Sequence, residues 1–206
     1  MWTSDGNAKP LSTRYDQSVD EIDRAMLSWL YSGRADGCLY GAMVVLSAVG
    51  GGWGMLAIVP WLFAHRTRRV AAWLIGTLLF TTTLVFVLKA LVGRVRPYAC
   101  IPGVHALCSA PTDPSFPSGH AAGSAAFAAF ISTIVLASGM ARRLAVAVIV
   151  ASVVFAIGVA ASRVVLGVHF PSDVIVGSLL GSLLGWAGAR RARADVDGTP
   201  TRAPIA

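Results

Sequence analysis

Two histidines and one aspartate carry the side chains with the most evident chemistry in this chain. His120 follows the segment Phe116–Gly119, and Asp173 lies four residues after His169. Proline is tolerated in the first turn of a helix, so a helix that begins near Pro171 can hold Asp173 within reach of His169. A carboxylate bonded to one ring nitrogen fixes the tautomer and leaves the other nitrogen as a nucleophile or base. We therefore expect two histidines that divide attack and proton transfer between them.

Three cations are placed to hold a phosphoryl group. Lys89 lies near the end of an apolar segment, Arg96 follows it, and Arg163 lies at the end of another apolar segment. The arginine fork matches phosphate oxygens, whereas lysine supplies a point charge. A charged group at the bilayer centre costs about 2.5–3.5 kcal/mol on insertion, and less near the surface. Snorkelling to the lipid headgroups explains one terminal lysine, but three cations at matched depth favour an anion site.

Ser118 and Gly119 precede a helix that we predict to begin near His120. The amide groups at a helix start point outward and favour an anion, and the serine hydroxyl adds a donor. The alternative is an ordinary N-cap serine followed by a turn glycine.

These groups together suit phosphoryl transfer. His169 attacks phosphorus and His120 protonates the leaving oxygen; water then hydrolyses the phosphohistidine with His120 as the base. We expect no metal and no cofactor, because the sequence has no cluster of carboxylates to hold a metal.

The composition indicates a membrane protein. Hydrophobic residues make up 55% of the 206 residues and charged residues 13%, whereas soluble domains carry about 25% charge. The net charge is +7, but the cations bracket apolar segments and form no single face, so we expect no nucleic-acid partner. The length predicts a single domain over residues 1–206.

Five apolar segments are long enough to cross a membrane, since a crossing needs about 20 residues. They cover residues 38–64, 70–88, 121–141, 144–161 and 174–189. The predicted fold is an all-α, polytopic transmembrane helix bundle over residues 38–189, with five spans, or six as the alternative. The triplet Gly50–Gly52 interrupts the first segment, so a re-entrant pair of half-helices is also possible there. The last segment carries a predicted small-residue packing face of Gly177, Gly181, Gly185 and Gly188.

The ends of the chain are polar. We predict a polar tail at residues 1–17 and a polar cytoplasmic tail at residues 190–206, which carries three arginines and then ends in a disordered segment. Residues 18–33 predict an amphipathic helix with one apolar stripe opposite Asp20, Glu21 and Arg24. The stripe consists of Val19, Ile22, Met26, Leu27, Leu30 and Tyr31. We expect it to lie in the membrane interface, with a helix packed on the bundle as the alternative.

Arginine clusters orient the spans. They fall at residues 65–69, 142–143 and 190–193, which alternating spans place on one side of the membrane. The positive-inside rule makes that side cytoplasmic, so the three polar clusters face the extracytoplasmic side of a cell membrane. In an oxidising compartment we expect Cys100 and Cys108 to form a disulfide, with two free thiols as the alternative.

The three clusters resemble the signature of a known family. They are similar to the three-part signature of the type 2 phosphatidic acid phosphatase superfamily. The pattern in this chain is Lys89-x6-Arg96-Pro97, then Pro117–His120, then Ser162-Arg163-x5-His169-x3-Asp173. That superfamily includes vanadium haloperoxidases and bacterial class A acid phosphatases, so the resemblance implies their core fold. It implies that Lys89, Arg96 and Arg163 bind phosphate, with Ser118 and Gly119 bonding its oxygens. It implies His120 as the general acid, His169 as the nucleophile and Asp173 as its orienting partner. Arg94 lies outside the signature and is interpreted as an accessory cation.

The resemblance implies a metal-independent membrane lipid phosphatase with a lipid phosphate or diphosphate as its partner. We expect a polyprenyl carrier, undecaprenyl or decaprenyl diphosphate, hydrolysed to the monophosphate in cell-wall carrier recycling. Phosphatidate, phosphatidylglycerol phosphate and a lipid A phosphate are the alternative substrates. A vanadate haloperoxidase and a membrane protein that binds phosphate without hydrolysis are the alternatives in other classes. The sequence leaves the oligomeric state open.

Overall fold

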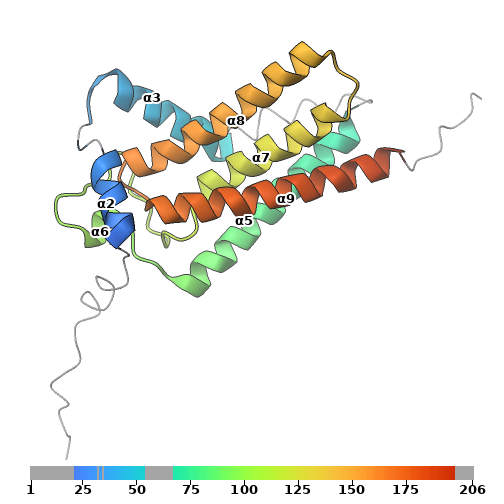
Figure 1. The fold of residues 1–206 in the computed structure, drawn as a ribbon. Helices are drawn as coiled ribbons and strands as arrows, with labels where there is room; N and C mark the ends of the chain where they lie inside the picture. The colour runs from blue at the N-terminus through green and yellow to red at the C-terminus, as the bar shows by residue number, and fades with distance from the viewer. Residues whose placement is uncertain (1–20, 32, 34, 54–66, 198–206) are drawn as a thin grey trace, which may run out of the picture.

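A computed structural model of the chain describes residues 21–31, 33, 35–53 and 67–197 (Figure 1). All of the regular secondary structure that it describes is helical, which confirms the all-α prediction. The elements are α2 (Glu21–Leu30), α3 (Gly37–Ala48), η1 (Val49–Trp53), α5 (Arg68–Val92), α6 (Pro97–Cys100), α7 (Gly119–Leu136), α8 (Arg142–Val165) and α9 (Pro171–Asp197). Among them α5, α7, α8 and α9 are long and apolar enough to cross a membrane.

Several helix ends differ from the predicted ends of the apolar segments. α9 continues to Asp197, beyond the predicted end of the last span at residue 189, so the helix extends into the predicted polar tail. Alanine and arginine are good helix formers, and side-chain contacts support this end. The Arg190 guanidinium lies over the Trp186 ring at 5.1 Å, and Trp73 Nε1 donates to Asp195 Oδ2 at 3.3 Å. Hydrophobicity marks where a span lies, but helical hydrogen bonding continues beyond it.

The first apolar segment breaks at its glycine triplet, as predicted. α3 gives way to η1, in which Gly51 leaves helical geometry at φ −80° and ψ −167°. Whether residues 38–64 cross once or fold back lies outside the described residues, because the description stops at Trp53. The predicted tail at residues 1–17 and the end of the chain from residue 198 lie outside it as well.

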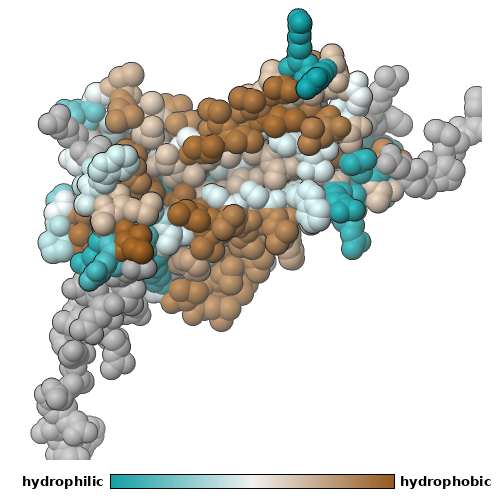
Figure 2. Space-filling model, in the orientation of Figure 1, coloured by the Kyte–Doolittle hydropathy of each residue, from teal (hydrophilic) through white to brown (hydrophobic). Residues whose placement is uncertain are grey.

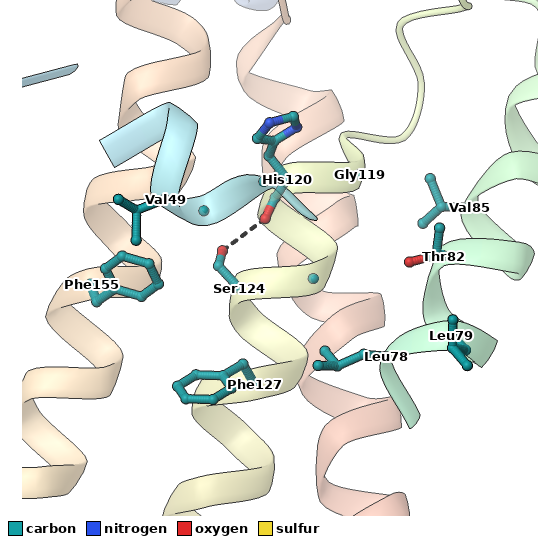
Figure 3. A pocket seen from close by; sticks show the side chains of 13 residues that line it. Val49, Leu78, Leu79, Thr82, Val85, Gly119, His120, Ser124, Phe127 and Phe155 are labelled. Atoms are coloured by element: carbon teal, nitrogen blue, oxygen red, sulfur yellow. Dashed lines mark hydrogen bonds between the residues drawn. The ribbon is translucent and has the colours of Figure 1, made fainter. Parts of the chain in front are cut away.

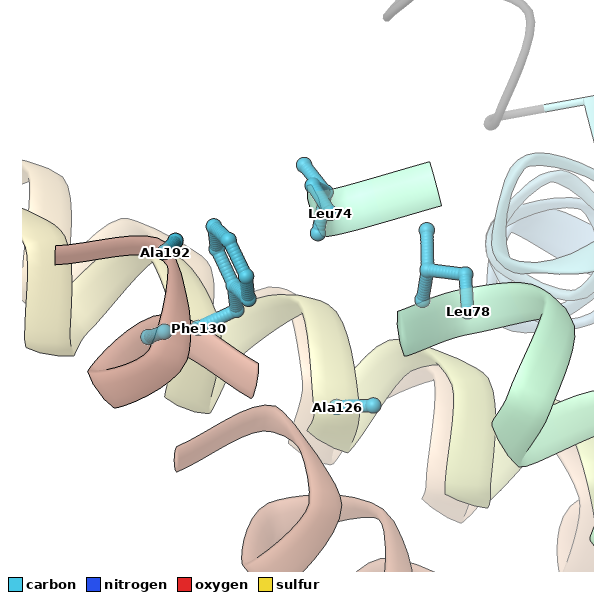
Figure 4. Close-up of a cluster of buried hydrophobic side chains, with 6 residues drawn as sticks. Leu74, Leu78, Ala126, Phe130 and Ala192 are labelled. Atoms are coloured by element: carbon cyan, nitrogen blue, oxygen red, sulfur yellow. The ribbon is translucent and has the colours of Figure 1, made fainter. Parts of the chain in front are cut away.

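α7 and α9 pack against each other with almost no space for side chains between them. A Cβ at Gly181 would lie 2.0 Å from the Ala122 oxygen, and a Cβ at Gly185 would lie 2.1 Å from the Ala126 oxygen. The predicted small-residue face is therefore confirmed. A core cluster next to it joins three helices: Leu74 and Leu78 of α5, Ala126 and Phe130 of α7, and Ala189 and Ala192 of α9 (Figure 4).

α2 packs on the bundle through Leu27, which lies in a buried cluster with Val164 and Phe170. The predicted stripe is wrong in part, because Ile22 and Met26 are exposed while Leu27 is buried. Ile22, Met26 and Trp29, which is 85% exposed, form an apolar stripe on the outer side of the helix. α2 thus combines features of both alternatives: one face packs on the bundle and another apolar face lies outside.

The surface has an apolar band between two more hydrophilic ends (Figure 2). The starts of α5 and α8 and the end of α9 lie at one end of the bundle, opposite α2 and α6 (Figure 1). The arginines at the starts of α5 and α8 and near the end of α9 therefore gather at that end, which is the arrangement that the span count predicts.

Replacing Gly185 with alanine is expected to destabilise the bundle by about 1–3 kcal/mol, because the new Cβ would overlap the main chain of α7. Gly76 on α5 is the matched control, since no heavy atom lies within 4 Å of its Cβ position. Alanine there is expected to leave stability unchanged or raise it slightly. Thermal unfolding in detergent measures both variants, and equal melting temperatures would contradict the close packing.

Candidate active site

The predicted site residues come from different helices and converge at the end of the bundle that carries α2 and α6. Lys89 lies in the last turn of α5, Arg96 precedes α6, Ser118 precedes α7, Gly119 and His120 begin α7, Arg163 lies in the last turn of α8, and His169 and Asp173 flank the start of α9. Lys89, Arg96, Ser118, Arg163, His169 and Asp173 are all buried. The three predicted clusters therefore form one site.

The geometry around His169 fixes its tautomer. Arg96 Nη1 lies 3.1 Å from His169 Nε2, and a guanidinium only donates hydrogen bonds. Nε2 must therefore be the accepting nitrogen, which places the ring proton on Nδ1. Nδ1 lies 3.5 Å from Asp173 Oδ2 and 3.4 Å from Ser115 Oγ. The electron pair of Nε2 thus accepts the hydrogen bond from Arg96.

Burial also keeps His169 neutral. The imidazole is 2% exposed, and loss of solvation lowers the pKa of His169 to about 4. The hydrogen bond to Asp173 raises the pKa and the charge of Arg96 lowers it, but burial has the larger effect. At neutral pH the ring is therefore an unprotonated base or nucleophile.

Asp113, in the loop before α7, bridges two of the predicted phosphate ligands. Its Oδ2 lies 2.8 Å from Lys89 Nζ, and its Oδ1 lies 2.9 Å from Arg96 Nη2. Lys89 also donates to the main-chain oxygen of Pro114. Burial acts to raise the pKa of Asp113, but the hydrogen bond and charge of Lys89, with those of Arg96, lower it overall. The carboxylate is thus ionised between two cations, which is the position expected for a phosphoryl group.

Two buried polar atoms in the site make no hydrogen bond with the described part of the chain. One is Ser118 Oγ and the other is Arg163 Nε. Ser118 makes no capping hydrogen bond to α7, which argues against the ordinary N-cap interpretation. A buried polar atom without a partner lowers the stability of the fold by about 1–3 kcal/mol. An anionic ligand that accepts hydrogen bonds from these two atoms would remove that cost.

His120 lies between the charged cluster and an apolar cavity. It is within electrostatic reach of Arg163, His169 and Arg96. A cavity of about 570 Å³ is lined by His120 and by apolar and small residues of α5, α7, α8 and η1 (Figure 3). Among the labelled residues are Val49, Leu78, Leu79, Val85, Phe127 and Phe155. His120 therefore lies where the charged cluster meets the apolar wall of the cavity.

No motif of the sequence pointed to three further side chains at the candidate site, two carboxylates and one hydroxyl. Asp113 and Ser115 lie in the loop before α7, and Asp23 lies on α2. Arg94 was expected to be an accessory cation, but it binds Asp173 and Asp23. One feature of the sequence pointed to Asp23: it lies four residues before Leu27 and therefore on the same face of the helix. Among the described residues, no three histidine, cysteine or carboxylate side chains cluster so as to hold a metal ion.

The predicted disulfide between Cys100 and Cys108 is wrong, because the structure has no bond between them. The Cys100 thiol donates to the main-chain oxygen of Arg96, one turn back in the chain, at 3.3 Å. The Cys108 thiol donates to the oxygen of Ser109 and lies within hydrogen-bonding reach of Arg163. The two thiols are directed to different partners.

Comparisons with known proteins bear out the family resemblance and the fold class. Residues 70–195 match the profile of the PAP2 superfamily. An undecaprenyl-diphosphatase of Sulfolobus acidocaldarius is 31% identical over 148 residues, which are 70% of this chain and 66% of that protein. A decaprenylphosphoryl-5-phosphoribose phosphatase of Mycobacterium tuberculosis is 37% identical over 136 residues, which are 65% of this chain and 68% of that protein.

Two solved structures are similar over most of the chain. LpxE of Aquifex aeolicus has a TM-score of 0.69 and 25% identity, with 84% of this chain and 97% of that chain covered. A transmembrane PAP2 type phosphatidylglycerolphosphate phosphatase of Bacillus subtilis has a TM-score of 0.71 and 25% identity, with 93% of this chain and 95% of that chain covered. The bundle is therefore that of membrane PAP2 phosphatases.

Replacing Asp113 with asparagine is expected to tighten binding of inorganic phosphate by about fivefold, because it removes an anion that competes for Lys89 and Arg96. Isothermal titration in detergent measures the affinity. Asp36→Asn is the matched control, since Asp36 is exposed and makes no side-chain capping bond. Weaker phosphate binding by the Asp113 variant would show instead that the carboxylate holds the two cations in place.

Proposed function

The chain belongs to the PAP2 superfamily and is a membrane-bound phosphatase, and from that premise we propose that it hydrolyses a polyprenyl diphosphate to the monophosphate. The observation that carries the proposal is the meeting of the charged cluster with an apolar cavity at His120. A lipid phosphate matches this arrangement, because its anionic head suits the charged cluster and its long apolar chain suits the cavity. The reaction would recycle the carrier lipid of cell-wall synthesis.

We assign the steps of the reaction to the residues that meet in this cluster. His169 Nε2 attacks the terminal phosphorus, and the bond from phosphorus to the bridging oxygen breaks. His120 gives its proton to that leaving oxygen. Water then attacks the phosphohistidine, His120 takes a proton from it, and the bond from phosphorus to Nε2 breaks to release inorganic phosphate.

The cations stabilise the charge that the transferring group carries. Arg96 Nη1 donates to the attacking nitrogen at 3.1 Å, so the guanidinium has to release that nitrogen and turn to the phosphoryl oxygens before the attack. Lys89 and Arg163 hold the other oxygens, with the hydroxyl of Ser118 and the amides at the start of α7 beside them. Asp113 has to leave the two cations that it bridges, or share them with the substrate.

The choice of a polyprenyl lipid is supported by the two curated relatives, because each is named for a polyprenyl phosphate. A second candidate is phosphatidylglycerol phosphate, for which the Bacillus subtilis structure is named. Both substrates present a terminal phosphate and an apolar chain, so the same catalytic residues serve either one. The extracytoplasmic position of the site is supported by the gathering of arginines at the opposite end of the bundle.

The purified protein is expected to release phosphate from a polyprenyl diphosphate faster than from phosphatidylglycerol phosphate, and His169→Ala is expected to abolish the release from both. The variant removes the nitrogen that attacks phosphorus, so a loss of at least about 10³-fold is expected. His105→Ala is the matched control, because His105 is exposed and bonds to Tyr31 through main-chain atoms. Faster release from phosphatidylglycerol phosphate would assign the protein to phospholipid synthesis. Wild-type rates in the His169 variant would exclude the mechanism.

The acidic limb of the kcat/KM profile is expected below pH 5. His169 has to be neutral to attack, and its pKa of about 4 lies below the ordinary value of about 6.5. Protonation therefore removes the nucleophile only as the pH falls through the lower value. Initial rates from pH 4 to pH 8 measure the profile, with the ionisation of the lipid phosphate followed separately by phosphorus NMR. An acidic limb centred near pH 6.5 that is not due to the substrate would contradict the assignment.

A further inference from the structure

Arg94 turns away from the phosphate site and binds the far side of Asp173. Its Nη1 lies 2.6 Å from Asp173 Oδ1 and 2.7 Å from Ser172 Oγ. The guanidinium also lies over the ring of Phe170 at 4.2 Å. Arg94 follows Gly93, whose φ of +64° ends α5 in the left-handed conformation that glycine adopts most readily. Arg94 is thus held against the carboxylate that contacts the proposed nucleophile.

Asp23 holds the other side of Arg94. Its Oδ2 lies 2.6 Å from Arg94 Nη2, and the Asp23 side chain is 6% exposed. Asp23 Oδ1 accepts a hydrogen bond from the Ser172 amide at 2.9 Å, and Oδ2 accepts one from Ser172 Oγ at 2.5 Å. Ser172 is in the first turn of α9, so Asp23 caps this helix from another helix and its charge suits the helix start. α2 is therefore bonded directly to the turn that carries Asp173.

The two carboxylate oxygens of Asp173 have different partners. Oδ2 accepts from Ser115 Oγ at 2.5 Å and from the Phe170 amide at 2.9 Å, and it faces His169 Nδ1. Oδ1 is bound by Arg94. A carboxylate held at both oxygens cannot rotate without breaking an ion pair in a buried site, which is costly. Arg94, together with Ser115 and the Phe170 amide, therefore keeps Oδ2 directed at His169.

We propose that Arg94 and Asp23 are positioning residues for His169. Arg94 fixes the Asp173 carboxylate, and Asp23 fixes both Arg94 and the first turn of α9. The site is then incomplete without α2, although the residues that match the family profile begin only at residue 70. This inference rests on the proposed role of His169 as the nucleophile. It replaces the interpretation of Arg94 as an accessory phosphate-binding cation.

The first experiment separates positioning from phosphate binding by kinetics. Arg94→Lys keeps the charge but cannot bind Asp173 and Asp23 at once through a planar fork. It is expected to lower kcat about tenfold to hundredfold, as for other groups that orient a catalytic ligand, with KM changed less than twofold. Asp23→Asn, which keeps the shape and loses the charge, is expected to lower kcat in the same way. Arg142→Lys, at the exposed start of α8, is the matched control.

A double-mutant cycle tests whether Arg94 acts through Asp173. In an Asp173→Asn background, Arg94→Lys is expected to cause less than a twofold further loss of kcat, because the group that it positions has lost its function. Additive losses would overturn the proposal, and so would a raised KM with unchanged kcat. Thermal unfolding in detergent is measured for each variant, and melting temperatures within a few degrees of wild type separate positioning from unfolding.

A spectroscopic measurement keeps the inference testable if the proposed function fails. In protein labelled with ¹⁵N in its histidine rings, wild-type His169 is expected to show one tautomer with the proton on Nδ1. Arg94→Lys and Asp23→Asn are expected to shift the Nδ1 signal or mix the tautomers, whereas Arg142→Lys leaves the spectrum unchanged. Unchanged His169 signals in the two site variants would overturn the inference. A shifted signal in a protein that hydrolyses neither lipid would support the inference and reject the proposed function.

Discussion

The arrangement of the site depends on the burial of one charge, the carboxylate of Asp173. It is fully buried, and an isolated buried carboxylate is very unfavourable unless protein donors replace its water. Ser115, the Phe170 amide and Arg94 supply these donors, and His169 lies beside them. They come from the loop before α7, from the turn before α9 and from the end of α5. Satisfying this charge therefore draws together the segments that build the rest of the site.

Close packing of α7 against α9 sets the distance between the two halves of the site. The Ser118 amide donates to the main-chain oxygen of Asp173 at 3.0 Å. A Cβ at Gly177 would lie 2.6 Å from the main-chain oxygen of Ser118. The start of α7, with the unpaired Ser118 hydroxyl, is thus held against the start of α9. A larger residue on this face would separate His120 from His169 as well as weaken the bundle.

The cations act against this convergence, because like charges that are brought together without solvent repel each other. Asp113 offsets this repulsion between Lys89 and Arg96. Beyond His120 the polar groups give way to the apolar cavity. The site is thus a cationic cluster that favours an anion, beside an apolar space that favours hydrocarbon, and this combination suits a lipid phosphate better than a soluble phosphate ester.

The sequence by itself determined the all-α membrane fold, the glycine break after α3, the glycine face of α9 and the eight residues that meet at the site. These features are encoded locally, in runs of apolar residues, in small-residue spacing and in polar groups that interrupt a span. Only the tertiary structure decided the ion pairs of Asp23, Asp113 and Arg94, the separate directions of the Cys100 and Cys108 thiols, and the extension of α9 to Asp197. Asp23 and Ser172 are 149 residues apart in the chain, and a charged residue carries no local mark of a partner at that distance. Asp23 pairs with Ser172 and Arg94 because the packing of α2 on the bundle brings these side chains to the same place.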